Sequence, residues 1–198
     1  MATISRYTVD ASPDSLLSGK VVLSGAKQIV FTPFNSAGTA PGSDSYYLES
    51  IIADTLSITQ DDPETNSIEC ETSDTAIKTT VVEGSYSIEM TCADIQKDIL
   101  EKLLGFGTST SVAPAGGTGT LNVAYAPESH SDRYCAIEIV FDDAILVCPK
   151  VNITSKIDIS SVKTETCKAT ISGTMELYNI GTAGSPIKTP FFVIYPNA

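Results

Sequence analysis

Apolar and polar side chains alternate with a period of two along much of this chain. The clearest example is residues 151–159, in which Val, Ile, Ile and Ile occupy positions 151, 153, 157 and 159, and polar residues lie between them. Residues 134–142 and 165–178 alternate in the same way. Successive side chains of a strand point to opposite faces, so this pattern is typical of half-buried strands. We therefore predict three long strands at these positions.

Shorter segments repeat the pattern and are rich in threonine, valine and isoleucine, which pleated surfaces favour. We predict further strands at residues 21–23, 28–34, 55–59, 67–71, 76–82, 85–90, 121–125, 144–148 and 191–195. The predicted fold class is mainly β, an antiparallel β-sandwich or barrel.

One segment breaks the alternation. Residues 93–104 (ADIQKDILEKLL) place Ile95, Ile99, Leu100, Leu103 and Leu104 on one helical stripe. Thr91 is suited to the N-cap of such a helix, and Gly105 is suited to the position just after its C-terminus. We predict one amphipathic α-helix here, packed against the sheet.

The 198 residues are enough for one well-cored domain, and no break in composition divides them. Within this single domain three stretches are predicted to be irregular: an N-terminal arm at residues 1–18, and loops at residues 32–45 and 107–120. Loops of this length are often functional. For residues 107–120 a disordered surface loop is an equal alternative.

Charge and cysteine content exclude several classes of protein. Acidic residues number 24 against 12 basic ones, a net charge of −12. Such a surface repels phosphate, which disfavours sequence-specific nucleic-acid binding and docking on anionic lipid. No apolar run approaches the length of a membrane span, and the N-terminus lacks the pattern of a secretory signal. The five cysteines show no paired spacing, so we interpret them as small buried side chains of a protein folded in a reducing cytoplasm.

The sequence contains no organised catalytic or ligand-binding motif. His130 lies in the polar segment ESHSDRY, which is typical of a turn and lacks the distant partners of a hydrolytic triad. The GGTGT segment at 116–120 lacks the lysine of a phosphate-binding loop. The acidic cluster of Asp61, Asp62 and Glu64 surrounds a proline, which indicates a turn better than a calcium loop. We expect no enzymatic activity, no cofactor and no metal.

Residues 54–106 resemble the middle of the phage major tail tube protein family. In that family a strand leads through a Q-D-x-P-like turn, here residues 60–63, into a strand with alternating charges. A hairpin follows and ends at a helix of the form D-I-x-x-x-I-L-x-x-L-L-G, here residues 94–105. The C-terminal strands are similar to those that complete the family's subunit. The resemblance covers roughly residues 54–180 as a pattern of elements.

This resemblance implies a structural virion protein with a β-sandwich and one flanking helix. Family subunits form homo-oligomeric rings, usually hexamers, and the rings stack into a tail tube that conducts DNA during ejection. The expected location is the virion tail, assembled in the host cytoplasm, with tail terminator, tail tip and tape-measure proteins as partners. The N-terminal arm and an early loop would reach the neighbouring ring, so the residues expected at inter-ring contacts are Tyr7, Phe34, Tyr46 and Tyr47.

On the same hypothesis the polar faces of two central strands line the channel, which places Glu69, Glu71 and Glu89 in the lumen. An acidic or neutral bore keeps DNA sliding, because every fixed cation would add affinity for phosphate. The alternative for these three residues is an ordinary solvated outer face. Two other functions stay open: the tube of a contractile injection system, and a secreted adhesin or fimbrial β-sandwich, which the Thr/Ser-rich composition fits.

Overall fold

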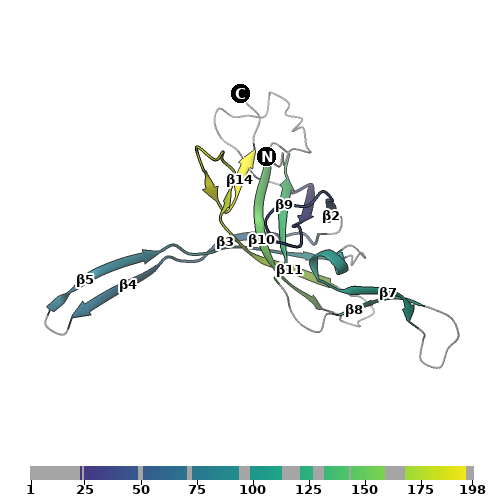
Figure 1. The fold of residues 1–198 in the computed structure, drawn as a ribbon, viewed down its shortest axis with the longest axis horizontal. Coiled ribbons are helices and arrows are strands. Elements are labelled where there is room, and N and C mark those ends of the chain that lie inside the picture. The colour runs from purple at the N-terminus through teal and green to yellow at the C-terminus, as the bar shows by residue number, and fades with distance from the viewer. Residues whose placement is uncertain are drawn as a thin grey trace.

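The protein is built around one large antiparallel sheet (Figure 1). The computed structural model describes residues 23, 25–48, 51–70, 73–93, 99–112, 121–126, 132–142, 144–158 and 168–194. The sheet has eight strands, in the spatial order β2-β1-β9-β10-β11-β6-β3, with β14 also paired to β10. Their bounds are β1 Gln28–Pro33, β2 Tyr46–Leu48, β3 Ser57–Gln60, β6 Tyr86–Cys92, β9 Tyr134–Val140, β10 Ile145–Asp158, β11 Lys168–Met175 and β14 Phe192–Ile194. Every pairing in it is antiparallel, which agrees with the predicted fold class.

The sheet curls until its two ends approach each other. Strand β2 ends at Leu48, and only three residues later Ile51 forms a bridge with Cys92 of β6, which is the second strand from the opposite end of the strand order. The amide of Ile52 donates to the carbonyl of Thr91 at 2.9 Å. Three residues span at most about 11 Å, so both ends of the sheet must lie close together here. The curled sheet encloses a single core cluster to which both ends contribute.

Strand β10 changes partner halfway along. On one side, residues Ile145 to Val147 pair with β14, whereas from Val151 onward β10 pairs with β11. A register shift against β9 separates the two parts, between Cys148 and Val151. Pro149 lies within that irregularity, where its missing amide hydrogen does least harm to the ladder. The sequence pattern predicted two strands here, and the structure joins them into one.

The two halves of the sheet differ in burial. In β1, β9 and the first part of β10, both faces are buried: one contributes to the core, and on the other Val30, Ala136, Ile145 and Val147 are at most 3% exposed. In β3, β6, β11 and the second part of β10, apolar side chains on one face pack into the core. The opposite face of that half is polar.

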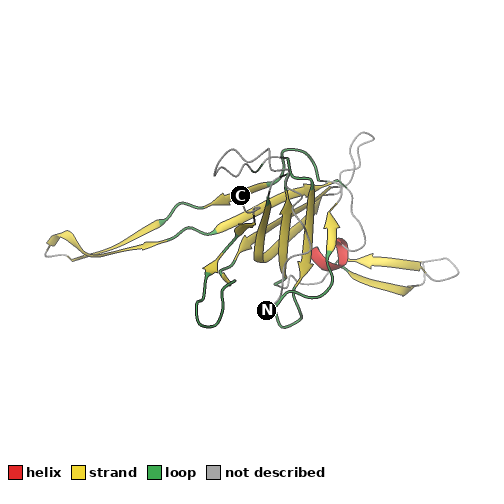
Figure 2. Ribbon diagram, turned by 90° about the horizontal axis from the view of Figure 1, so that it is seen from above, coloured by secondary structure: helices red, strands yellow, loops and turns green. Residues whose placement is uncertain are grey.

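Three hairpins leave the sheet, and two of them form arms that project to opposite sides of the body (Figure 2). The β4–β5 arm consists of β4 (Glu64–Cys70) and β5 (Ser73–Val82), inserted between β3 and β6. The β7–β8 arm consists of β7 (Gly107–Val112) and β8 (Leu121–Tyr125), inserted before β9. The third is a short C-terminal hairpin of β12 (Tyr178–Asn179) and β13 (Lys188–Thr189), between β11 and β14.

The predicted α-helix over residues 93–104 is not confirmed. The part that the structure describes holds one π-helical segment, η1 (Ile99–Leu103), and residues 94–98 lie outside it. Its apolar side does face the core as expected, since Leu103 and Leu104 are both buried. Gly105 adopts a left-handed φ of 74°, as predicted for the residue after a helix, and the amide of Phe106 closes the segment on the carbonyl of Leu100 at 2.8 Å.

Most predicted strands are confirmed within a few residues, and the exceptions are informative. The prediction for residues 21–23 lies almost wholly outside the described residues. The prediction of an irregular segment at 107–120 is wrong in its first half, because residues 107–112 form β7 and pair with β8. Between Phe34 and Ser45 the chain makes turns and an isolated bridge, as the predicted loop implied. Strands β2, β12 and β13 were not predicted.

Candidate functional site: a hydroxyl-rich sheet face and two open arms

The central part of the polar face of β3, β6, β11 and the second part of β10 is made almost entirely of short uncharged side chains. Alternation explains it, since the residues between them, such as Ile58, Ile88 and Ile153, belong to the core or pack against it. Eight outward positions form the part of this face that we call the hydroxyl face: Ser57, Thr59, Ser87, Glu89, Asn152, Thr154, Ser172 and Thr174. Beyond it the same register continues through Thr91, Thr170 and Lys156, and then through Lys168 and Asp158.

The strand register arranges the hydroxyl face in two rows that cross all four strands. One row runs Ser57, Glu89, Ser172 and Thr154, and the next runs Thr59, Ser87, Thr174 and Asn152. Hydroxyl groups bond to one another across the strands, Thr59 to Ser87 at 2.8 Å and Thr154 to Ser172 at 3.3 Å between oxygens. The eight positions contain one carboxylate and no cation, and the charged positions at which the register of β10 with β11 continues beyond them are Lys156, Lys168 and Asp158, so the face is polar but nearly neutral.

The three glutamates predicted to line a channel are not all on this face. Glu89 is exposed on β6, on the side opposite Ile88 and Met90, as the alternation predicted. Glu69 belongs to β4, which forms a separate two-stranded sheet with β5. Its side chain and the whole of Glu71 lie outside the described residues. Within one subunit, the large sheet therefore holds Glu89 alone of the three.

Two of the aromatic residues predicted at inter-ring contacts are used inside the subunit. Phe34 lies 6.4 Å from the ring of Tyr134 and 6.1 Å from the ring of Tyr178, and it is half-buried. Tyr46 stacks on Phe31 with ring centroids 5.3 Å apart. Tyr47 is 47% exposed on the edge strand β2, so its ring is accessible to a partner. Tyr7 lies outside the described part of the chain.

Each arm is a two-stranded ribbon that pairs with no third strand in the part of the chain that the structure describes. An isolated two-stranded ribbon is marginally stable in water, and both of its edges offer unpaired backbone groups. At the base of the β4–β5 arm, Val81 and Val82 are 60% and 51% exposed. Large β-branched side chains on consecutive positions face both sides of the ribbon, which indicates surfaces that a partner covers.

The β4–β5 arm continues the register of β3 and β6. Gln60 pairs with Tyr86 and Glu64 with Val82, so four steps forward on one strand match four steps back on the other. Between these pairs the ladder is interrupted at residues 61–63 and 83–85, where Asp61 and Ser85 are joined by a backbone and a side-chain hydrogen bond. Gly84 is required here, because a Cβ at this position would overlap the carbonyl oxygen of Asp61.

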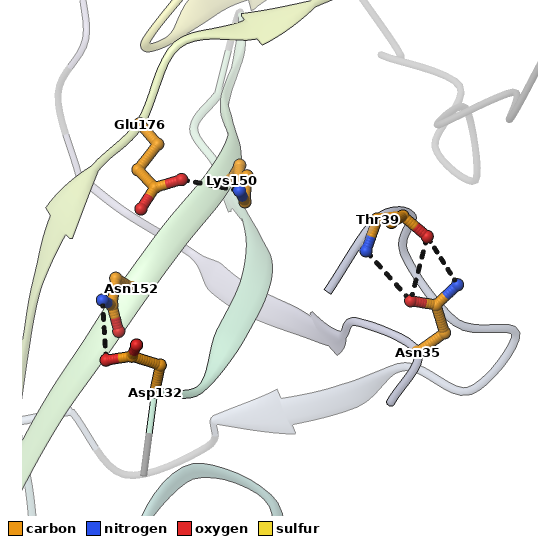
Figure 3. Close-up of polar contacts among 6 residues, drawn as sticks. All are labelled: Asn35, Thr39, Asp132, Lys150, Asn152 and Glu176. Atoms are coloured by element: carbon orange, nitrogen blue, oxygen red, sulfur yellow. Dashed lines mark hydrogen bonds and ion pairs between the residues drawn. The ribbon is translucent and has the colours of Figure 1, made fainter. Parts of the chain in front are cut away.

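A polar cluster anchors the base of the C-terminal hairpin (Figure 3). Lys150 and Glu176 form an ion pair at 2.6 Å, and the Lys150 ammonium lies 4.2 Å from the centroid of the Tyr134 ring. The Tyr134 hydroxyl donates to Glu176. Desolvation, together with the carboxylates of Glu176 and Asp132, raises the pKa of Tyr134, so this hydroxyl stays protonated and acts as a structural donor.

The described residues offer little for catalysis or metal binding. They contain no cluster of three or more histidine, cysteine, aspartate or glutamate residues arranged to hold a metal. Cys92, Cys135 and Cys148 are buried, as the sequence predicted, and burial raises the pKa of Cys148 to about 12. His130 lies beyond the described positions. Within those positions, no helix has the length and apolar character to cross a membrane.

No protein-family model matches this chain, and the search of curated proteins finds no match either.

Proposed function

We propose that this chain is a structural subunit of a virion tail tube, in which copies form hexameric rings and the rings stack around a bore that conducts DNA. The observation that carries the proposal is the pair of hairpin arms that project from opposite sides of one body with their strand edges open (Figure 2). The resemblance of residues 54–180 to tail tube proteins supplies the specific architecture, including the number of subunits in a ring.

The arms support self-assembly because the unpaired backbone groups at their edges are stabilised by pairing with another chain. A protein that leaves ribbon edges open invites pairing with another chain, and natural proteins protect such edges unless pairing is their use. Arms on opposite sides make a head-to-tail contact, in which the surface donated by one copy differs from the surface it receives. Repetition of a head-to-tail contact closes into a ring when the rotation between copies divides a full turn.

The chemistry of the hydroxyl face supports its proposed place on the wall of a bore that conducts DNA. Neutral hydroxyl groups bind water and present no fixed cation, so DNA passing over them gains no counterion-release affinity. Glu89 adds a repulsive charge to this face, and the net charge of −12 repels phosphate at longer range. The proposal therefore places the hydroxyl face toward the lumen, with Glu89 on its surface.

The remaining parts of the proposal follow from the resemblance. The subunit acts without a cofactor and has no catalytic role. Its partners are further copies of itself and the tail terminator, tail tip and tape-measure proteins, and it is assembled in the host cytoplasm into the virion. The tube of a contractile injection system shares this architecture and differs in its cargo.

The test is assembly of the purified chain, followed by mass photometry and negative-stain electron microscopy. We expect hollow rings or tubes. A matched variant replaces residues 64–82 with an Asn-Gly turn between Pro63 and Glu83, which removes the β4–β5 arm and leaves the body. We expect this variant to be a folded monomer, because no described residue of the arm belongs to the core cluster.

Two results would contradict the proposal. One is a wild-type chain that stays monomeric at every concentration, both alone and when seeded with a tail-tip complex. The other is an arm-deleted variant that still forms tubes of wild-type appearance, since the arms would then not be the assembly elements.

A further inference from the structure

The C-terminal hairpin exposes more large apolar surface than its size explains. Eight large apolar side chains are exposed in the described residues, and three of them lie on this hairpin: Leu177 at 67%, Ile180 at 39% and Ile187 at 56%. The hairpin contributes no side chain to the core cluster. A concentration of exposed apolar groups on one small element marks an interaction surface.

The hairpin is held rigidly, so it presents these side chains in one arrangement. The side-chain oxygen of Asn179 accepts hydrogen bonds from the amides of Gly181 and Ile187, at 3.1 and 3.0 Å. At the base, the Lys150–Glu176 ion pair attaches it to the body (Figure 3), and so does the edge-on contact of Tyr178 with Phe34. A preorganised surface loses less conformational entropy when it binds.

The hairpin carries a cation close in sequence and register to an exposed apolar group. Asn179 and Lys188 are directly opposite in register, and Leu177, which is 67% exposed, comes two residues before Asn179 at the start of the same hairpin. Lys188 is exposed, and it forms no ion pair with any residue that the structure describes. On a chain with a net charge of −12, an exposed ammonium without an ion pair among the described residues is available to a carboxylate of a partner.

The base of the β4–β5 arm offers the complementary arrangement. Val82 is 51% exposed, and Glu64 lies directly opposite it in register, so the two share one face of the ribbon. Glu64 is exposed as well. This face thus places a carboxylate beside an apolar group, as the hairpin places an ammonium near one.

We propose that the Leu177–Lys188 surface of one copy docks on the Val82–Glu64 face of a second copy, with leucine against valine and ammonium against carboxylate. This inference rests on the self-assembly proposed above and names the two surfaces that meet. A contact of the hairpin surface with its own equivalent would bring two Lys188 ammonium groups together. The heterologous contact avoids this repulsion and repeats from copy to copy.

The test is a charge exchange in the full-length chain. Lys188→Glu and Glu64→Lys are made separately and together, and the lowest concentration that yields assemblies is measured by sedimentation at low salt. We expect each single variant to raise that concentration about fivefold, which corresponds to about 1 kcal/mol, and the double variant to restore it to within about twofold. Leu177→Ser should also raise it about fivefold.

The matched control is Lys102→Glu, which makes the same change of charge at an exposed position of η1, outside both docking surfaces. We expect it to assemble within about twofold of wild type. The docking would be overturned if the double variant needed as high a concentration to assemble as the single variants, or if Lys188→Glu assembled at the same concentration as Lys102→Glu. In either case a wild-type chain that assembles would leave the proposed function unaffected. A wild-type chain that never assembles would overturn both.

Discussion

Cys135 and Cys148 show how strongly one side chain's surroundings control its chemistry. Both thiols are buried, and Cys148 has no exposed area. Burial raises the pKa of Cys148 to about 12, and burial together with the nearby Cys148 raises the pKa of Cys135 further. The thiolate is the reactive form of cysteine, so these groups are inert in the folded protein.

This shift makes stability depend on pH. In the unfolded chain both thiols lose their protons near pH 8.5, whereas in the folded chain they keep them, so the native state binds more protons. The free energy of unfolding is therefore expected to be constant below about pH 8 and to fall above about pH 8.5, by about 1.4 kcal/mol per pH unit for each thiol. Urea denaturation between pH 7 and pH 10 would measure the slope.

A variant with Cys135→Ala and Cys148→Ala provides the comparison. It removes both groups, so its stability should fall less steeply over the same pH range, even if cavities lower its absolute stability. An identical slope in the wild type and the variant would mean that other groups cause the alkaline loss.

Among single residues, the sequence predicts burial better than it predicts contacts. The burial of Cys92, Cys135 and Cys148 follows from their places in apolar or alternating segments, whereas Cys70 and Cys167 are outside the side chains that the structure describes. The exposure of Glu89 follows from alternation too. The use of Phe34 within the subunit does not, because it depends on Tyr134 and Tyr178, which are about 100 and 144 positions away along the chain.

Strand β11 contains a glycine where the curl of the sheet leaves no room for a side chain. Gly173 lies on the core side between Ile88 and Ile153 in register. A Cβ at this position would lie 2.6 Å from a methyl group of Val151 and 2.7 Å from the carbonyl oxygen of Asn152. Because one of these atoms belongs to the backbone of β10, relief of the overlap requires the two strands to separate.

We therefore expect Gly173→Ala to lower the free energy of unfolding by about 1–3 kcal/mol, the usual range for overpacking. Gly184→Ala is the control, since a Cβ at that position would have no other atom within 4 Å. It should change stability by less than about 0.5 kcal/mol. Chemical denaturation of both variants would measure the difference. Equal stabilities would show that β10 and β11 separate at little cost.

Whether an element has a buried apolar face explains which elements the sequence predicted. Strands with large apolar residues at every second position, such as β9, β10 and β11, were found because their pattern records a buried face. Strand β7 was missed because its Gly-Thr-Ser-Thr-Ser-Val sequence has almost no apolar residue to record one. Strands β12 and β13 have two residues each, too few to show a period. The helix prediction relied on a correct apolar stripe, but the stripe does not distinguish a full α-helix from the π-helical segment η1.

Over the molecule as a whole, burial and exposure are divided between the body and the arms. The core cluster draws its described residues from the curled sheet, η1 and their connections. Within the described residues, the two strands of each arm pair only with one another. This division separates folding of the body from assembly, so changes in the arms and on the hydroxyl face should alter function without unfolding the protein.

The variant Glu89→Lys tests whether the hydroxyl face lines the bore of the assembled tube. In assembled tubes the substitution would place a cation on the bore in every subunit, and each phosphate contact adds about 0.9 to the slope of log affinity against log salt. We expect DNA ejection through such tubes to slow, with the rate recovering at high salt. Glu89→Gln is the control, because it removes the carboxylate at the same position without adding a cation, so ejection should stay close to the wild-type rate. Normal ejection by assembled Glu89→Lys tubes would place this face outside the bore.

The β4–β5 arm keeps the register of β3 and β6 across the interruption at residues 61–63 and 83–85, and this has a consequence for how the length of the arm can evolve. Adding one residue to each strand of the arm lengthens it by about 3.4 Å and leaves every pair of β3 with β6 unchanged. Two such steps also restore the original facing of the side chains, because a strand repeats every second residue. The length of the arm, and so its reach toward a neighbouring copy, can therefore change in increments of about 7 Å, while the residues that determine the fold of the body stay unchanged.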